Sequence, residues 1–464
     1  MACFWFYQNE IKLEIPSSED IGNVTFYKIQ VHVSGIEWVV LHRYSEFYDL
    51  HYHLVLDHGV SKDILPSKKV IRNKCPEFIE RRRKALEEYI QKIFVFLKQT
   101  MPKILVDFLC FNVYDSFFLL QDLSSRCFLE ADIVLSTNKS YYFSTLEVFN
   151  SKAFQLHAIS QFLKKTQPLL NNAESRFDMS PVLDLCSQLN VLRVQGSSGT
   201  YLKSNIILNK LSFELSAFKN LNILYINNVL FDIIFSLGNI RDTLLELHVA
   251  NTNTTKVCQI LQCDVIHKYN LESSQKWTAL EVLDLSNNNL TEIDTTITLV
   301  PNLKKLILND NKISTISNLS SLSNLSYLSL SNNLITICND LHLKLGNILT
   351  LNLSQNNIVT CKGFSKLYSL ENLDLSSNKI TEIDEIKHIG GLPCLENFIL
   401  TGNSVAATVD YRIKVLEFFK ERAKFICLDN EKPSQAELDK VSVLQALSII
   451  KEGKTPKLTV NTAN

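Results

Sequence analysis

Hydrophobic and polar residues follow two different patterns along the chain, and the first occupies its N-terminal part. Residues 25–40 read TFYKIQVHVSGIEWVV, two β-rich runs separated by a Ser-Gly pair, which predicts a β-hairpin. The next segment, RYSEFYDLHYHLVLDHG, places Phe47, Leu50 and Leu54 on one face of a predicted helix. Ser45 is the expected N-cap of that helix, because its hydroxyl can accept a backbone N–H of the first turn.

A basic loop separates this helix from a longer one. After LPSKKVIRNKCP, Pro76 is expected at the first position of a helix that runs through EFIERRRKALEEYIQKIFVFLK. Residues 1–114 are therefore predicted to form a small antiparallel sheet with helices, an α+β fold.

The second pattern is a repeat with a longer period. The motif LxxLxLxxN occurs six times, with steps of 23, 22, 23, 22 and 25 residues between successive asparagines, and this spacing is typical of leucine-rich repeats. One repeat cannot bury its own leucines, so neighbouring repeats must stack them into a continuous core. Each asparagine amide is expected to satisfy backbone groups at the turn after a strand. The six asparagines are Asn288, Asn311, Asn333, Asn356, Asn378 and Asn403.

Weaker units precede the six clear ones, so the α/β solenoid is predicted to begin near residue 186. After the last repeat, the segment DYRIKVLEFFKERAKFICLD is predicted to cap the open end of the leucine core. The predicted domains are an α+β domain at 1–114, a connector at 115–185, the solenoid with its cap at 186–427, and a helix with a tail at 428–464.

Composition narrows the class of function. The chain has 464 residues, a formal net charge of -1 and 46% hydrophobic residues, which is typical of a folded multidomain protein without a global affinity for nucleic acid. Eleven cysteines show neither a CxxC pair nor zinc-ligand spacing, so we expect reduced cytosolic thiols and neither a metal nor a cofactor. The N-terminus lacks the pattern of a signal peptide, and no uncharged apolar run approaches about 20 residues.

A local excess of positive charge stands out in this neutral protein. Nine basic and three acidic residues lie between Lys62 and Lys84. The apolar stripe of the second predicted helix places Arg82 and Arg83 at the two edges of its buried face, while Arg81 points away. An arginine at the edge of a core is expected to bind an anion.

The strands, HRYSEF, the lysine-containing proline loop and ERRRKALEEY together resemble the phox-homology (PX) domain family over residues 10–114. The resemblance implies binding of phosphatidylinositol 3-phosphate. Arg43 would contact the 3-phosphate, Tyr44 would pack under the inositol ring, Lys68 would contact the 1-phosphate, and Arg82 would contact the ring hydroxyls. Lys69 is an alternative to Lys68. Beyond the loop, Val70 and Ile71 either touch lipid or pack under the loop.

The order of the parts, with phrases such as KLGNILTLNLSQNNI and GGLPCLEN, resembles the nischarin family, also described as imidazoline receptor candidates. The resemblance implies protein clients such as Rab or Rac small GTPases, p21-activated kinases and integrin cytoplasmic tails. Long members of that family continue into further regions, and partners of those regions are not carried over.

The residues that alternate with the repeat leucines should project from the concave face of the solenoid. This mildly acidic and polar surface would suit a protein or peptide and would repel phosphates. The alternative is a solvated face without a specific client. The column of residues is Asp284, Ile307, Ser329, Asn352, Asp374 and Ile399, with Tyr327 as a neighbour.

The sequence contains no phosphate-binding loop, nucleophile elbow or dinucleotide fingerprint, so we expect no enzyme activity. The leading hypothesis is an adaptor in the cytoplasm, peripherally bound to endosomal membranes through phosphatidylinositol 3-phosphate, whose repeats hold a signalling or trafficking protein. The alternative is a protein-only scaffold like the regulatory subunits of phosphatases, with a PX domain that does not bind lipid.

Overall fold

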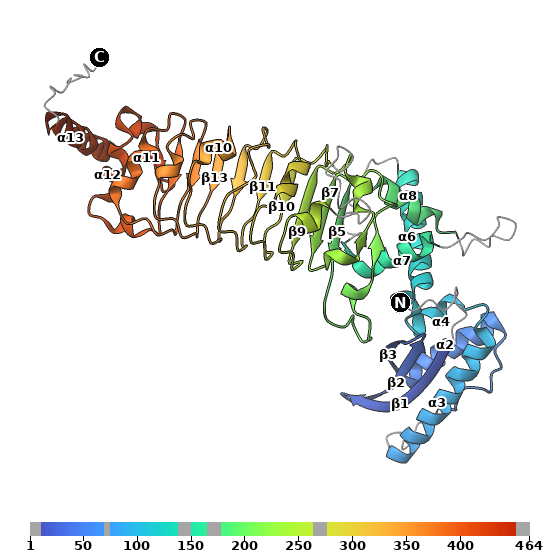
Figure 1. Ribbon diagram of the computed structural model, residues 1–464. Helices are drawn as coiled ribbons and strands as arrows, with labels where there is room; N and C mark the ends of the chain where they lie inside the picture. The colour runs from blue at the N-terminus through green and yellow to red at the C-terminus, as the bar shows by residue number, and fades with distance from the viewer. Residues whose placement is uncertain (1–10, 69–74, 138–149, 165–177, 263–275, 452–464) are drawn as a thin grey trace. The chain divides into compact units, whose positions relative to one another are not determined.

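The computed structural model describes residues 11–68, 75–137, 150–164, 178–262 and 276–451 (Figure 1). Packing divides the chain into two compact units. The first contains residues 1–189, 194–218 and 233–235, and the second contains residues 190–193, 219–232 and 236–464. The domain boundaries expected from the sequence stay predictions, because they rest on sequence patterns rather than on packing.

The first unit begins with a three-stranded antiparallel sheet in the order β1-β2-β3. The predicted hairpin joins β2 (Val24–Val33) to β3 (Ile36–Arg43), and Ser34 and Gly35 take the positive φ angles, 50° and 79°, that its tight turn requires. β1 (Ile11–Ile21) was not predicted as a strand. Its register on β2 shifts between Glu14 and Ser17, on either side of a proline, so its sequence lacks a clean alternation.

Helices cover this sheet and extend the first unit. The predicted helix after Pro76 is confirmed as α3, which has this proline in its first turn. The elements are α2 (Tyr44–His58), α3 (Pro76–Leu97), α4 (Lys103–Phe108), α5 (Phe111–Tyr114), α6 (Ser116–Thr137), β4 (Asn150–Lys152), α7 (Ala153–Leu163), α8 (Ser180–Gln188), β5 (Val191–Gln195), which continues from the second unit, η3 (Leu208–Lys210), β6 (Phe213–Glu214) and β8 (Ile234–Phe235).

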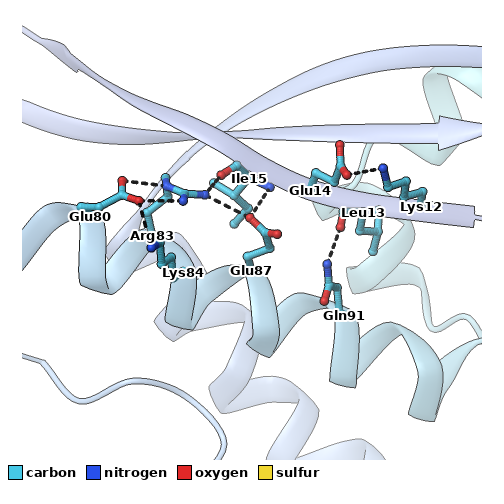
Figure 2. A network of polar contacts seen from close by, with 9 residues as sticks. All are labelled: Lys12, Leu13, Glu14, Ile15, Glu80, Arg83, Lys84, Glu87 and Gln91. Atoms are coloured by element: carbon cyan, nitrogen blue, oxygen red, sulfur yellow. Dashed lines mark hydrogen bonds and ion pairs between the residues drawn. The ribbon is translucent and has the colours of Figure 1, made fainter.

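Side chains of α3 satisfy the free edge of β1 (Figure 2). Arg83 donates to the backbone carbonyl of Ile15 and forms ion pairs with Glu80 at 2.7 Å and with Glu87 at 3.0 Å. The Ile15 N–H donates to the same Glu87 carboxylate at 3.1 Å, and the Gln91 amide donates to a further β1 carbonyl at 2.7 Å. An open strand edge would otherwise present unpaired backbone groups, so these contacts both attach the helix and close the edge.

The other edge of the sheet is closed by a distant part of the chain. The Val39 N–H donates to the Lys203 carbonyl at 2.9 Å, and the Asn205 N–H donates to the Glu37 carbonyl at 3.1 Å. The Asn205 side chain accepts from the Glu37 N–H and donates to the Gly35 carbonyl, both at 3.0 Å. Residues 203–205 thus add a short antiparallel segment to β3, inside the first unit.

The second unit is a parallel ladder with one short strand per repeat, which confirms the expected solenoid (Figure 1). The repeat leucines are buried between strands and turns, for example Leu283, Leu306 and Leu328. The strands are β7 (Ile223–Asn227), β9 (Glu246–Ala250), β10 (Val282–Asp284), β11 (Lys305–Ile307), β12 (Tyr327–Ser329), β13 (Thr350–Asn352), β14 (Asn372–Asp374), β15 (Asn397–Ile399) and β16 (Cys427–Leu428).

Short helices and turns return the chain between these strands. They are η4 (Phe231–Ile233), η5 (Leu237–Ile240), α9 (Cys258–Leu261), η8 (Thr295–Leu299), α10 (Leu341–Leu345), η9 (Lys362–Phe364), η10 (Ile383–Ile386), α11 (Lys387–Gly390), η11 (Ser404–Ala407), α12 (Tyr411–Glu417), η12 (Lys420–Phe425) and the longer α13 (Gln435–Lys451).

The repeat asparagines are buried and hydrogen-bonded to backbone, as expected. The Asn356 amide donates to the carbonyls of Leu330, Leu353 and Ser354 at 2.8, 3.1 and 3.0 Å, and its oxygen accepts from the Ile335 N–H at 3.0 Å. One side chain therefore satisfies backbone groups of two successive repeats, where the turns leave no backbone partner.

Replacing this asparagine tests its role. We expect Asn356→Ala to lower the free energy of unfolding by about 2 kcal/mol or more, because buried backbone groups lose their partners. The neighbouring Asn357→Ala, at a half-buried position, is the matched control and should change it by less than about 0.5 kcal/mol. Urea unfolding followed by circular dichroism measures the free energy of unfolding of both variants. Equal losses would contradict the hydrogen bonds of Asn356 as the cause of the destabilisation.

The edge contacts of α3 generate a second prediction. Arg83→Ala should lower the free energy of unfolding by about 1 to 3 kcal/mol, because the Ile15 carbonyl loses its donor and Glu87 loses its ion pair. Lys84→Ala removes a positive charge that is 67% exposed on the same helix, and should cost about 0.5 kcal/mol at most. Thermal unfolding measures the stability of both variants. If Lys84→Ala is destabilised as much as Arg83→Ala, the loss of a positive charge on α3, rather than the loss of the edge contacts, is the cause.

Candidate anion-binding site

The junction between β3 and α2 places Arg43 at the end of the sheet. Arg43 is the last residue of β3, and α2 begins at the next residue. The expected cap at Ser45 is wrong, because the helix already begins at Tyr44. The Glu46 carboxylate performs this function instead, accepting the Arg43 N–H at 3.2 Å. Glu46 also lies 3.3 Å from Nε of the Arg43 guanidinium, whose side chain is 52% exposed.

Arg82 is buried beside this junction, with only 9% of its surface exposed. Its guanidinium lies between two aromatic rings, with its central carbon 4.3 Å from the centroids of both Tyr44 and Phe78. Within the part of the chain that the structure describes, its buried Nη2 has no hydrogen-bond partner. A buried charged donor without an acceptor is unfavourable by about 1 to 3 kcal/mol, so this group favours the binding of an anion or hydroxyl acceptor.

Two tyrosine hydroxyls lie around this guanidinium. Burial raises the pKa of Tyr27 and that of Tyr44, and in both cases the nearby Arg82 charge partly opposes the shift. The Tyr44 hydroxyl donates to the Pro66 carbonyl at 2.5 Å, which ties the loop after α2 to the site. Lys68 lies two residues further along that loop and is exposed.

The structure thus brings together Tyr44, Arg82 and the loop that carries Lys68, while Arg43 adjoins Tyr44 in the chain. Lys69, Val70 and Ile71 lie outside the described residues. Sequence reasoning missed Phe78, although its position four residues before Arg82 on one helix face was a usable signal.

The two adjacent arginines of α3 have different roles. Both lie at the edges of the buried face, and Arg81 is exposed, as the helical pattern predicted. Arg83 has carboxylate and backbone partners, whereas Arg82 lies against two aromatic rings and keeps an open donor at Nη2 within the described residues. Of this pair, Arg82 is therefore the candidate for ligand binding.

The predicted concave column forms one row across the parallel sheet. Asp284, Ile307, Ser329, Asn352, Asp374 and Ile399 are consecutive partners in the strand register. Tyr327 lies in the adjacent row, where the Lys305 ammonium is 4.8 Å from its ring centroid. Ser329 is buried and donates to the Asn309 side chain, so it offers little surface to a partner.

A histidine extends this row toward the first repeats. His248 is the register partner of Asp284, stacks on Tyr225 with ring centroids 4.4 Å apart, and lies within 3.4 Å of Asp284 and 3.2 Å of Glu246. Burial alone would lower the pKa of His248, but hydrogen bonds to the two carboxylates outweigh it and raise the pKa. The row therefore carries a compensated charge cluster that sequence reasoning missed.

The described residues contain no group of histidine, cysteine and carboxylate side chains that could hold a metal ion. Among the described helices, none is both long enough and apolar enough to cross a membrane.

Comparison with known proteins identifies both kinds of module. Residues 30–111 match the PX domain family, residues 278–335 match the leucine-rich repeat family, and residues 346–388 match the family of leucine-rich repeats in two copies. The chain joins a PX domain to leucine-rich repeats. Both modules are typically binding domains without enzyme activity: PX domains generally bind phosphoinositides, and leucine-rich repeats generally bind proteins.

The curated relatives match the PX domain. Sorting nexin-24 of Homo sapiens is 39% identical over 85 residues, which are 18% of this chain and 48% of that protein. Sorting nexin-14 of Danio rerio is 40% identical over 105 residues, covering 22% of this chain and 11% of that protein. This chain therefore spans about half the length of sorting nexin-24.

Solved structures resemble the separate parts. A leucine-rich-repeat protein of Leptospira interrogans is 22% identical, with a TM-score of 0.39, and the match covers 57% of this chain and 61% of that one. A designed CISK-PX domain is 36% identical, with a TM-score of 0.20, and the match covers 21% of this chain and 96% of that one.

The charge cluster around His248 predicts a pH-dependent contribution to stability. Because its pKa is raised in the folded state, the contribution is complete below the ordinary histidine pKa and is lost as the pH rises through the folded value. His248→Gln should therefore destabilise the protein more at about pH 6 than at about pH 8.

Urea unfolding at the two pH values measures this difference. His342→Gln on α10 is the matched control, since His342 forms no ion pair within the described part of the chain. A pH-independent cost of His248→Gln would show that stacking on Tyr225, rather than charge, holds the cluster.

Proposed function

We propose that the PX domain binds phosphatidylinositol 3-phosphate in endosomal membranes and that the repeats hold a protein client there. The observation that carries this proposal is the buried Arg82 guanidinium, fixed between two rings with an open donor. Such a donor is oriented before the ligand arrives, so little conformational entropy is lost on binding.

The surrounding groups fit a phosphorylated inositol. Arg43 offers an exposed planar cation for bidentate phosphate binding, and Lys68 offers a second charge on the adjacent loop. Tyr44 supplies an aromatic surface beside the Arg82 guanidinium. The PX resemblance implies these roles for Arg43, Tyr44, Lys68 and Arg82.

A single headgroup site gives only modest membrane affinity, so a second signal is needed for stable residence. The basic segment from Lys62 to Lys84 supplies attraction to anionic lipid. Lys69, Val70 and Ile71 are proposed to add lipid contacts from the tip of the same loop.

The repeats are proposed to bind protein rather than lipid. Their row combines half-buried polar and apolar groups with the carboxylate of Asp374, which disfavours phosphate, while Asp284 is paired with His248. By resemblance to the nischarin family, the candidate clients are Rab or Rac small GTPases, p21-activated kinases and integrin cytoplasmic tails. The chain would then act as a non-enzymatic adaptor at the cytoplasmic face of endosomes.

Liposome co-sedimentation tests the lipid site. Wild type should pellet selectively with phosphatidylinositol 3-phosphate among the phosphoinositides. Arg43→Ala and Arg82→Gln should each weaken binding about tenfold or more, because each removes a charge-assisted hydrogen bond to the headgroup. Arg81→Ala, which removes an exposed charge from the same helix, should retain nearly wild-type binding.

Thermal unfolding controls for loss of fold, especially at the buried Arg82. If all three arginine variants weaken binding equally, the attraction is non-specific charge. If wild type ignores every phosphoinositide yet still binds a client, the protein-only scaffold becomes the better description.

A further inference from the structure

His42, the residue before Arg43, makes two contacts that are chemically informative. Its Nε2 lies 2.7 Å from the Phe108 backbone carbonyl, and its Nδ1 lies 2.8 Å from the Glu46 carboxylate. The ring stacks on the Phe108 ring with centroids 3.8 Å apart, and 17% of the side chain is exposed. Its position is therefore fixed from both sides.

The two ring nitrogens of His42 both face hydrogen-bond acceptors, the Phe108 carbonyl oxygen and a Glu46 carboxylate oxygen. A carbonyl oxygen cannot donate, so Nε2 must carry a proton. Neutral histidine would then present a lone pair at Nδ1 to the Glu46 carboxylate, which is unfavourable unless one of the two groups gains a proton. The same carboxylate oxygen accepts the Arg43 N–H and the other oxygen faces the Arg43 guanidinium, and both contacts favour an ionised Glu46. The geometry therefore fits an imidazolium at His42.

The three side chains form a row of alternating charge, His42, Glu46 and Arg43, that ends at the candidate phosphate ligand. When His42 is protonated, it shares the Glu46 carboxylate, and the row has a net positive charge to offer an anion. When His42 is neutral, Glu46 compensates Arg43 alone, and the row is neutral. Arg43 then has less charge available for a phosphate.

We propose that His42 and Glu46 are positioning residues of the phosphoinositide site, and that protonation of His42 strengthens phosphate binding at Arg43. This inference rests on the proposed lipid-binding function. Proton binding at His42 and phosphate binding at Arg43 favour one another, so the affinity for phosphate should rise as the pH falls.

Two other titratable groups lie near His42, Tyr27 and Asp107, and neither takes over its effect on Arg43. Tyr27 is its register partner on β2, and burial raises the pKa of that phenol, which stays neutral. On α4, Asp107 adjoins Phe108, and burial raises the pKa of its carboxyl. Glu46 and Arg43 are the charged groups in the row itself. The lipid phosphate gains its own proton near pH 6, which opposes the effect and must be separated from it.

Variants at position 42 separate the two titrations. Binding to phosphatidylcholine vesicles with and without phosphatidylinositol 3-phosphate is measured from about pH 6 to about pH 8 for wild type, His42→Gln and His42→Arg. The first variant is permanently neutral and the second is permanently charged. His53→Gln, at an exposed histidine of α2, is the matched control. Thermal unfolding at each pH confirms that each variant is folded.

We expect wild type to bind about fivefold more tightly than His42→Gln at pH 6, with the difference vanishing at pH 8. His42→Arg should lose the histidine-dependent part of the pH profile, whereas the control His53→Gln should retain the wild-type profile. Glu46→Gln should flatten the profile as well, because the carboxylate that couples His42 to Arg43 is gone.

A folded His42→Gln that follows the wild-type profile at every pH would overturn this inference and leave the lipid site intact. If wild type binds no phosphoinositide at any pH, the proposed function fails and this inference fails with it. The two failures are therefore distinguishable in one series of measurements.

Discussion

A buried backbone N–H or C=O must have a hydrogen-bond partner, and this requirement accounts for much of the polar chemistry inside both units. In the repeats, the turns after the strands leave groups that only a side chain can reach, and the asparagine amides fill that role. In the first unit, both edges of the β1-β2-β3 sheet pose the same problem. Arg83, Gln91 and Asn205 solve it with side-chain contacts to the exposed backbone.

The buried Nη2 of Arg82 is an exception, because within the described residues it has no hydrogen-bond partner. Its immediate neighbour Arg83 is saturated with acceptors, so the chain can provide them where structure requires it. Arg82 is instead held by two aromatic rings, which fix the guanidinium while its Nη2 stays able to donate to a ligand. This arrangement separates the task of positioning a cation from the task of neutralising it.

The sequence predicts local features well and distant contacts poorly. The repeats were predictable because the spacing of their leucines and asparagines is visible in the sequence. The position of Arg82 at the edge of the buried helix face followed from helical periodicity. Strand β1 was missed because a register shift and a proline interrupt its alternation of hydrophobic and polar residues. His42 and Glu46 were missed for a different reason. Their significance depends on the Phe108 carbonyl, which lies 66 residues from His42 in the chain and reaches it only through the fold.

The pairing of residues 203–205 with β3 has a consequence for how the protein is made. The sheet leaves the ribosome long before its edge partner has been synthesised, so β3 emerges with unpaired groups at Glu37 and Val39. At translation rates of about 5 to 20 residues per second, that interval lasts many seconds. During it, the nascent chain presents an open strand edge to its neighbours, and chaperone protection would matter most at that stage.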